Sequence, residues 1–198
     1  MLLTPLFILL APIVLIVLWV VSTYNFFVSS KARIKAAVQE IGNQLKRQAD
    51  LIPNLESSVK GYMKQEKKIF SDLTEARKSI ASAVKSGDIQ KMSTAGNQLA
   101  SLLPSLKVVV EDNPELKSDK VVGQLMDELR DTADKIMYAR RLVIDLTADF
   151  NVKRVTVPSS LVANMFKFDE LPGLITPEKG EHVSVSEKDT KTPKINLD

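Results

Sequence analysis

The sequence contains no cysteine, a single histidine and only seven glycines among its 198 residues. The lack of cysteine excludes disulfides, thiolate metal sites and cysteine nucleophiles. The one histidine, His182, lies in a polar C-terminal stretch, where we expect a solvated side chain and not a ligand or a base. Few glycines and little strand-like alternation favour long helices.

An excess of one charge sign is also missing. The 27 basic residues are balanced by 24 acidic ones, which leaves a net charge of +3. The two signs are interspersed, so no basic stripe of the kind that binds nucleic acid is present. Phosphate-binding glycine loops, the serine elbow and the Glu-x-x-His pairs of di-iron bundles are absent as well. We therefore expect no enzymatic activity, no cofactor, no metal site and no nucleic-acid partner.

The first thirty residues carry no charged side chain. Residues 6–28 are dominated by Leu, Ile, Val, Phe and Trp, and a helix of this length can cross roughly 30 Å of hydrocarbon. We expect residues 1–5 to form a short N-terminal segment and residues 6–28 a single transmembrane anchor. A cleaved signal peptide is the alternative. Signal peptides begin with a basic segment, however, and no Lys or Arg precedes Lys31.

Basic residues follow the apolar stretch directly, at Lys31, Arg33 and Lys35. The positive-inside rule places such a flank on the cytoplasmic side. We therefore expect a single-pass protein of the cell membrane, with its N-terminus outside and its C-terminal domain in the cytoplasm.

Beyond the anchor, apolar residues recur at spacings of three and four, as in a helix that buries one face. Pro53 falls within this pattern, and an interior proline costs about 3 kcal/mol. Because the phase survives across Pro53, we favour one long helix, kinked there, over two helices that turn there. Two positions of the stripe are polar, Gln48 and Glu66. The apolar positions are Ile34, Val38, Ile41, Leu45, Ile52, Leu55, Val59, Tyr62, Ile69, Leu73, Ala76 and Ile80.

Two further helices are predicted. The glycine and cap of Ser86-Gly87-Asp88 separate the first long helix from a second, at 88–110, and residues 111–117 form a loop. A third helix begins at Ser118 or Asp119, and its regular stripe runs from Val122 through Leu129 to Phe150. The predicted fold is all-α: an antiparallel bundle of three long helices (four if the chain turns at Pro53) over residues 29–170, and a disordered tail over 171–198.

With the helices placed, several local sequences resemble the LemA family. The unbroken run from Gln44 to Tyr62 is the most specific of them. The resemblance implies an N-terminal membrane anchor followed by a helical domain, and it supplies no reaction. The chain departs from the family pattern at Gln65-Glu66, Val143-Ile144 and Val157-Pro158. Its other matching segments are Tyr24-Asn25, Glu75-Ala76-Arg77, Pro114-Glu115-Leu116-Lys117, Ala139-Arg140-Arg141, Asp149-Phe150-Asn151 and Pro193-Lys194-Ile195-Asn196.

Polar residues near Pro53 are the candidate interaction site. Lys46 and Arg47 lie four and three residues before Asp50, so both cations can approach its carboxylate on a helix. The group is either a surface ion pair or, together with Asn54, a polar platform for a partner.

The candidate buried polar residues are Gln48, Glu66, Arg140 and Arg141. A buried carboxylate without a partner is costly, so we expect Arg140, Arg141 or Lys135 to approach Glu66, or water to reach it.

An apolar cluster in 161–168 either folds back onto the bundle or lies on the membrane surface or in a partner's groove. The functional hypothesis is a membrane-anchored, non-enzymatic helical scaffold that binds the lipid bilayer and a protein partner. Two alternatives stay open: an accessory or chaperone-like regulatory subunit of a membrane protease or transporter, and a self-assembling, coiled-coil-like homo-oligomer.

Overall fold

A computed structural model describes residues 3–59 and 67–174 of the chain. Within these ranges the chain is helical and contains no strand, which confirms the all-α fold class. Tyr62, Glu66 and most of the predicted tail, residues 175–198, lie outside the described residues. The helices are α1 (Leu3–Val59), α2 (Lys67–Ser86), α3 (Ile89–Asp112), α4 (Pro114–Ser118), α5 (Lys120–Val155) and α6 (Ser159–Met165).

The first helix, α1, is continuous over 57 residues and passes through both Pro12 and Pro53. The chain therefore does not turn at Pro53. It also does not continue as one helix to Lys85, because the Thr74 hydroxyl of α2 donates to the Glu56 carboxylate of α1 at 3.1 Å, although the two residues are 18 apart. In one straight helix they would be roughly 27 Å apart.

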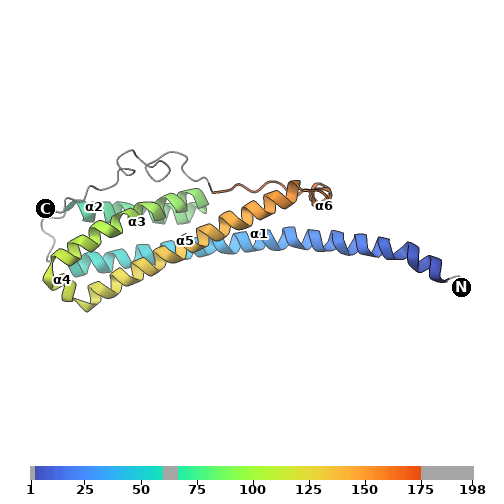
Figure 1. Ribbon diagram of the computed structural model, residues 1–198. Helices are drawn as coiled ribbons and strands as arrows, with labels where there is room; N and C mark the ends of the chain where they lie inside the picture. Colours follow the sequence, from blue (N-terminus) through green and yellow to red (C-terminus); the bar gives the residue numbers. More distant parts are fainter. Residues whose placement is uncertain (1–2, 60–66, 175–198) are drawn as a thin grey trace, which may run out of the picture.

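The chain thus reverses between α1 and α2, and the predicted bundle of three long helices is wrong in number. Four long helices, α1, α2, α3 and α5, make up the described bundle (Figure 1). The apolar stripe could not distinguish the two arrangements, because a helical hairpin can bury the same face on both of its arms.

The turn between α2 and α3 follows the sequence prediction. Gly87 adopts a φ of +67°, in the left-handed region that favours glycine. The Asp88 carboxylate accepts from the backbone N–H groups of Gln90 and Lys91, at 2.8 and 3.1 Å, and so caps α3.

The predicted loop at 111–117 is only partly a loop, because α4 occupies Pro114–Ser118. Its start has a local cause: Asn113 accepts from the N–H of Glu115, and Pro114 fits the first turn, where its missing N–H costs nothing. Asp119 then caps α5, which agrees with the predicted helix start at Ser118 or Asp119.

Helices α1 and α5 run side by side in opposite directions, with α2 and α3 beside the end of this pair that lies farther from the N-terminus (Figure 1). The predicted stripe of α5 forms the core: Val122, Leu129, Ile136 and Val143 are at most 5% exposed. At Gly96 of α3 the helices approach closely, since a Cβ there would lie 3.3 Å from the Leu45 side chain.

The N-terminal part of α1 extends beyond the bundle (Figure 1). Over residues 10–18 its side chains are exposed, and Leu15, Ile16 and Leu18 are 60–66% exposed. Among the described helices, α1 is the one that is long and apolar enough to cross a membrane.

Candidate interaction surfaces

The predicted polar platform lies on the surface of α1, and Lys46, Arg47, Asp50 and Asn54 are all exposed. Its charges pair differently from the prediction. Arg47 reaches across to Glu128 of α5 at 2.5 Å, and in the described part of the chain neither Lys46 nor Arg47 pairs with Asp50. The ion pair therefore joins two helices, and Lys46, Asp50 and Asn54 stay available at the surface.

Gln48, the neighbour of Arg47, is buried as predicted, with 1% of its surface exposed. Its side-chain Nε2 donates to the backbone carbonyl of Leu129 at 3.4 Å. No described residue donates to its Oε1. Arg47 and Gln48 therefore both bind α1 to the same turn of α5. Arg47 does so at the surface, through Glu128, and Gln48 does so in the core, through Leu129.

Arg140 joins α5 to α3. It is half-buried, and its guanidinium donates to the Asn97 side chain of α3 at 2.6 Å. Burial lowers the pKa of Arg140 below its ordinary value.

The predicted partnership with Glu66 falls on a residue outside the described ranges. Of its candidate partners, Arg140 contacts Asn97 and Lys135 pairs with Asp131 at 2.6 Å. Arg141 is exposed, so the prediction that it is buried is wrong.

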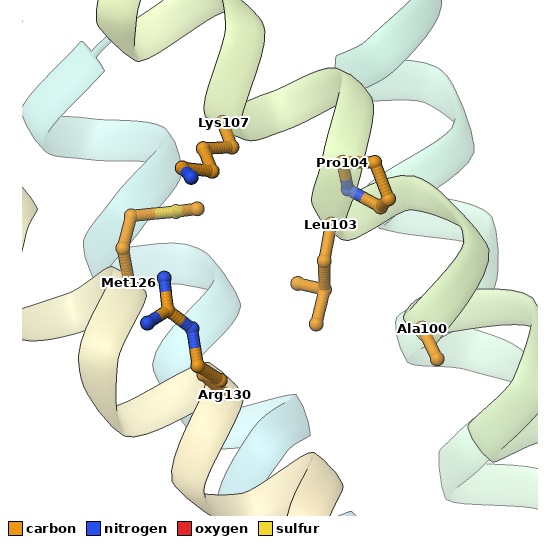
Figure 2. Close-up of a pocket in the computed structure, with 6 residues that line it drawn as sticks. All are labelled: Ala100, Leu103, Pro104, Lys107, Met126 and Arg130. Atoms are coloured by element: carbon orange, nitrogen blue, oxygen red, sulfur yellow. The ribbon is translucent and has the colours of Figure 1, made fainter.

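A hollow of about 420 Å³ opens between α3 and α5 at Pro104. Figure 2 shows Lys107 of α3 pointing towards Met126 and Arg130 of α5, with Leu103 beside the gap. Lys107 also pairs with Glu111 one turn further along α3, at 3.4 Å. Exposed cations over an apolar floor of this kind are an ordinary feature of a helix boundary.

An aromatic cluster lies where the bundle meets the protruding part of α1. Phe27 and Phe150 are fully buried, with ring centroids 5.2 Å apart. Phe168, just beyond α6, stacks on Phe27 at 4.8 Å and contacts Tyr24 at 5.7 Å. The 161–168 segment therefore folds back onto α1 and α5, the first of the two alternatives that the sequence left open.

Polar groups hold this cluster in place. The Asn151 side chain both donates to and accepts from the backbone of Leu171, at 2.8 and 3.0 Å, and Arg154 donates to the carbonyl of Phe168 at 3.1 Å. Cations cover its rings: the Lys31 ammonium lies 5.5 Å from the Phe168 centroid, and that of Lys153 lies 4.2 Å from Phe26. Leu171, the first residue of the predicted disordered tail, is therefore bound to Asn151 of α5 and is ordered.

The sequence pattern does not join these aromatic residues into one cluster. Phe27 belongs to the predicted anchor, Phe150 to a helix stripe and Phe168 to a separate apolar segment. A signal was present, since the Tyr24-Asn25 and Asp149-Phe150-Asn151 segments are both features of the family that the chain resembles. The structure brings these two segments together at one end of the bundle.

The described residues contain no group of three or more His, Cys, Asp or Glu side chains placed to hold a metal ion. His182 lies outside them.

The fold and its surfaces define a class of protein: a helical bundle whose first helix extends, without a break, into a segment apolar enough to span a membrane. The chain belongs to the LemA family, whose sequence pattern matches residues 37–186. The match begins after the apolar segment and takes in the described bundle from Ala37 onward. No curated protein matches the chain.

Proposed function

We propose that the protein is a membrane-tethered, non-enzymatic scaffold that holds its helical bundle beside the bilayer for a protein partner. The observation that carries the proposal is the continuity of α1 from Leu3 to Val59. The same helix supplies the apolar segment and one wall of the bundle, so no flexible linker separates them. Such a connection fixes the height and orientation of the bundle surface above the membrane.

Membrane anchoring is supported by the exposure of the apolar segment. Leu15, Ile16 and Val17 are consecutive and more than half exposed, which is costly in water and favourable in hydrocarbon. A core helix would instead bury such residues against its neighbours. The basic residues Lys31, Arg33 and Lys35 favour a cytoplasmic bundle and an external N-terminus.

A scaffolding role is supported by how the bundle uses its polar side chains. Arg47, Gln48 and Arg140 each contact a neighbouring helix, and so contribute to packing. The exposed Lys46, Asp50 and Asn54 remain for a partner. A membrane protease or transporter, with this chain as its accessory subunit, is one partner of this kind.

Burial of the apolar stripes within one chain supports a monomeric scaffold over a self-assembling coiled coil. Leu45 and Leu129 are fully buried by intramolecular contacts and are not open to a second copy. Light scattering of the full chain in detergent should give the mass of one protein chain once the bound detergent is subtracted. A stable dimer or larger assembly would favour the self-assembling alternative.

Proximity labelling tests the scaffold. The full chain carries a labelling enzyme at its C-terminus, and the matched control carries the enzyme directly after residue 30. We expect both to stay in the membrane pellet after alkaline extraction, and some proteins to be labelled only by the full chain. Exchanging Lys46 and Asp50 for residues of opposite charge should reduce that specific labelling. Identical labelling by the full chain and the control would contradict a scaffolding bundle.

A further inference from the structure

The short helix α6 has two apolar faces, and only one of them is covered. Val162 and Ala163 are at most 2% exposed, against α1 and α5. Leu161 and Met165 are 67% and 63% exposed, and they share a face because they are one turn apart. Phe166 follows and is 44% exposed. We refer to Leu161, Met165 and Phe166 as the α6 outer face.

The place of this face along α1 indicates what covers it. The ring of Phe166 contacts that of Tyr24, with centroids 4.8 Å apart. At 1.5 Å per residue, Tyr24 lies roughly 31 Å along α1 from Leu3. That length matches the hydrocarbon thickness of about 30 Å. Figure 1 shows α6 beside α1. When Leu3–Tyr24, in place of the predicted 6–28, fills the hydrocarbon, α6 therefore lies at the boundary between lipid and water.

We propose that the α6 outer face inserts into the lipid at this boundary, as a second membrane contact beside the α1 anchor. The inference rests on the membrane anchoring proposed above. Leu, Met and Phe on one side of a short helix suit an interfacial position, where the apolar face sinks below the headgroups and the other face stays on the protein. Because α6 lies to one side of α1, its insertion also fixes the rotation of the bundle about the anchor.

The basic and acidic side chains around α6 are nearly equal in number, so they do not favour anionic over uncharged lipid. We therefore expect the insertion to depend on apolar contact and to occur on uncharged phosphatidylcholine as well as on anionic lipid. Lys153 extends over Phe26, which leaves its ammonium free to lie at headgroup level. The basic residues are Lys31, Lys153, Arg154 and Lys167, and the acidic ones are Asp149, Asp169 and Glu170.

The composition of the chain allows a clean test, since it has no cysteine and one tryptophan. Met165→Cys, in the full chain, carries an environment-sensitive fluorophore and is reconstituted into phosphatidylcholine vesicles that contain lipids with a nitroxide near the headgroup. The matched control is Val121→Cys, an exposed apolar position of α5 (54%) far along that helix from α6. In parallel, quenching of Trp19 by lipids with brominated chains reports whether the anchor is inserted.

We expect the label at 165 to shift to shorter wavelength and to be quenched several-fold more than the label at 121, with Trp19 also quenched. If Trp19 is quenched while the labels at 165 and 121 behave alike, the insertion of α6 is wrong and the anchoring stands. If Trp19 is not quenched, the anchoring itself is wrong. A label at 165 that is shielded only in native membranes, and not in pure lipid, would assign the face to a protein partner and overturn the inference. Leu161→Cys serves as a second labelled position, so that the result does not depend on one variant.

Discussion

The two halves of α1 contain similar apolar residues but distribute them differently around the helix. In the N-terminal half, Leu15, Ile16 and Val17 follow one another, and all are more than half exposed. In the C-terminal half, Ile41, Leu45 and Ile52 fall on one stripe and are fully buried. A helix that is apolar on every side is matched to lipid, whereas a striped helix is matched to protein neighbours. The arrangement of apolar residues, more than their number, therefore indicates which solvent each half meets.

The largest effect is expected from charging the N-terminal half. Arg at the centre of a membrane-spanning helix costs about 2.5–3.5 kcal/mol, so the double variant Leu15→Arg/Val17→Arg should disfavour insertion by roughly 5–7 kcal/mol. We expect it to be lost from the membrane pellet after alkaline extraction, while its bundle keeps its thermal unfolding transition by circular dichroism. The control Val108→Arg/Val121→Arg, at two half-exposed positions of the bundle, should pellet like the unmodified chain. If the Leu15→Arg/Val17→Arg variant stayed in the pellet, the N-terminal half of α1 would not be the part that anchors the protein.

The second largest effect is expected from shortening a side chain in the buried stripe of the bundle. Leu129→Ala removes a fully buried side chain that packs in the same core as Leu45, and should lower the free energy of unfolding by about 2–5 kcal/mol. Val121→Ala, on the exposed face of the same helix, should change it by less than about 0.5 kcal/mol. Urea unfolding in detergent measures both. Membrane association should be unaffected, and a Leu129 variant as stable as the Val121 variant would show that Leu129 is not core.

The same contrast explains what could be predicted from the sequence. Periodicity and caps are local, and they correctly predicted the buried face of α5 and the helix starts at Asp88 and Asp119. The reversal between α1 and α2 could not be predicted from the same signal, because a straight helix and a hairpin share one apolar stripe. The structure resolves the two through a contact between Thr74 and Glu56.

The candidate site was less predictable because its contacts join distant segments. Arg47 has Asp50 within one helical turn but pairs with Glu128, which is 81 residues away. The aromatic cluster similarly joins Phe27 of α1, Phe150 of α5 and Phe168, which follows α6. A pattern along the sequence can place each residue on a face of its helix, but it does not identify the residue that the neighbouring helix brings to that face.

A smaller effect is expected from the polar position inside the stripe of α1. The Oε1 of Gln48 is buried with no donor among the described residues, and its Nε2 makes only a long bond, 3.4 Å, to the Leu129 carbonyl. The Thr132 hydroxyl also donates to that carbonyl, at 2.9 Å, so the carbonyl stays satisfied without Gln48. Gln48→Leu should therefore raise the free energy of unfolding by about 1 kcal/mol. Gln48→Ala, which leaves a void, should lower it, and destabilisation by both would show that the amide contributes to stability.

The smallest effect is expected from the Arg47–Glu128 pair, although it joins α1 to α5. Both side chains are more than two-fifths exposed, at 49% and 42%, so water screens their attraction. A double-mutant cycle with Arg47→Ala and Glu128→Ala should give a coupling energy of about 0.2–1 kcal/mol. This coupling should fall as salt is raised from 0.1 to 1 M, since the screening length shortens from about 10 to about 3 Å. The matched cycle with Lys46→Ala and Asp50→Ala, which are one turn apart but unpaired in the structure, should give a smaller coupling. If the Lys46–Asp50 cycle gives the larger value, the charges of α1 pair within the helix and the contact to α5 is not the one that stabilises the bundle.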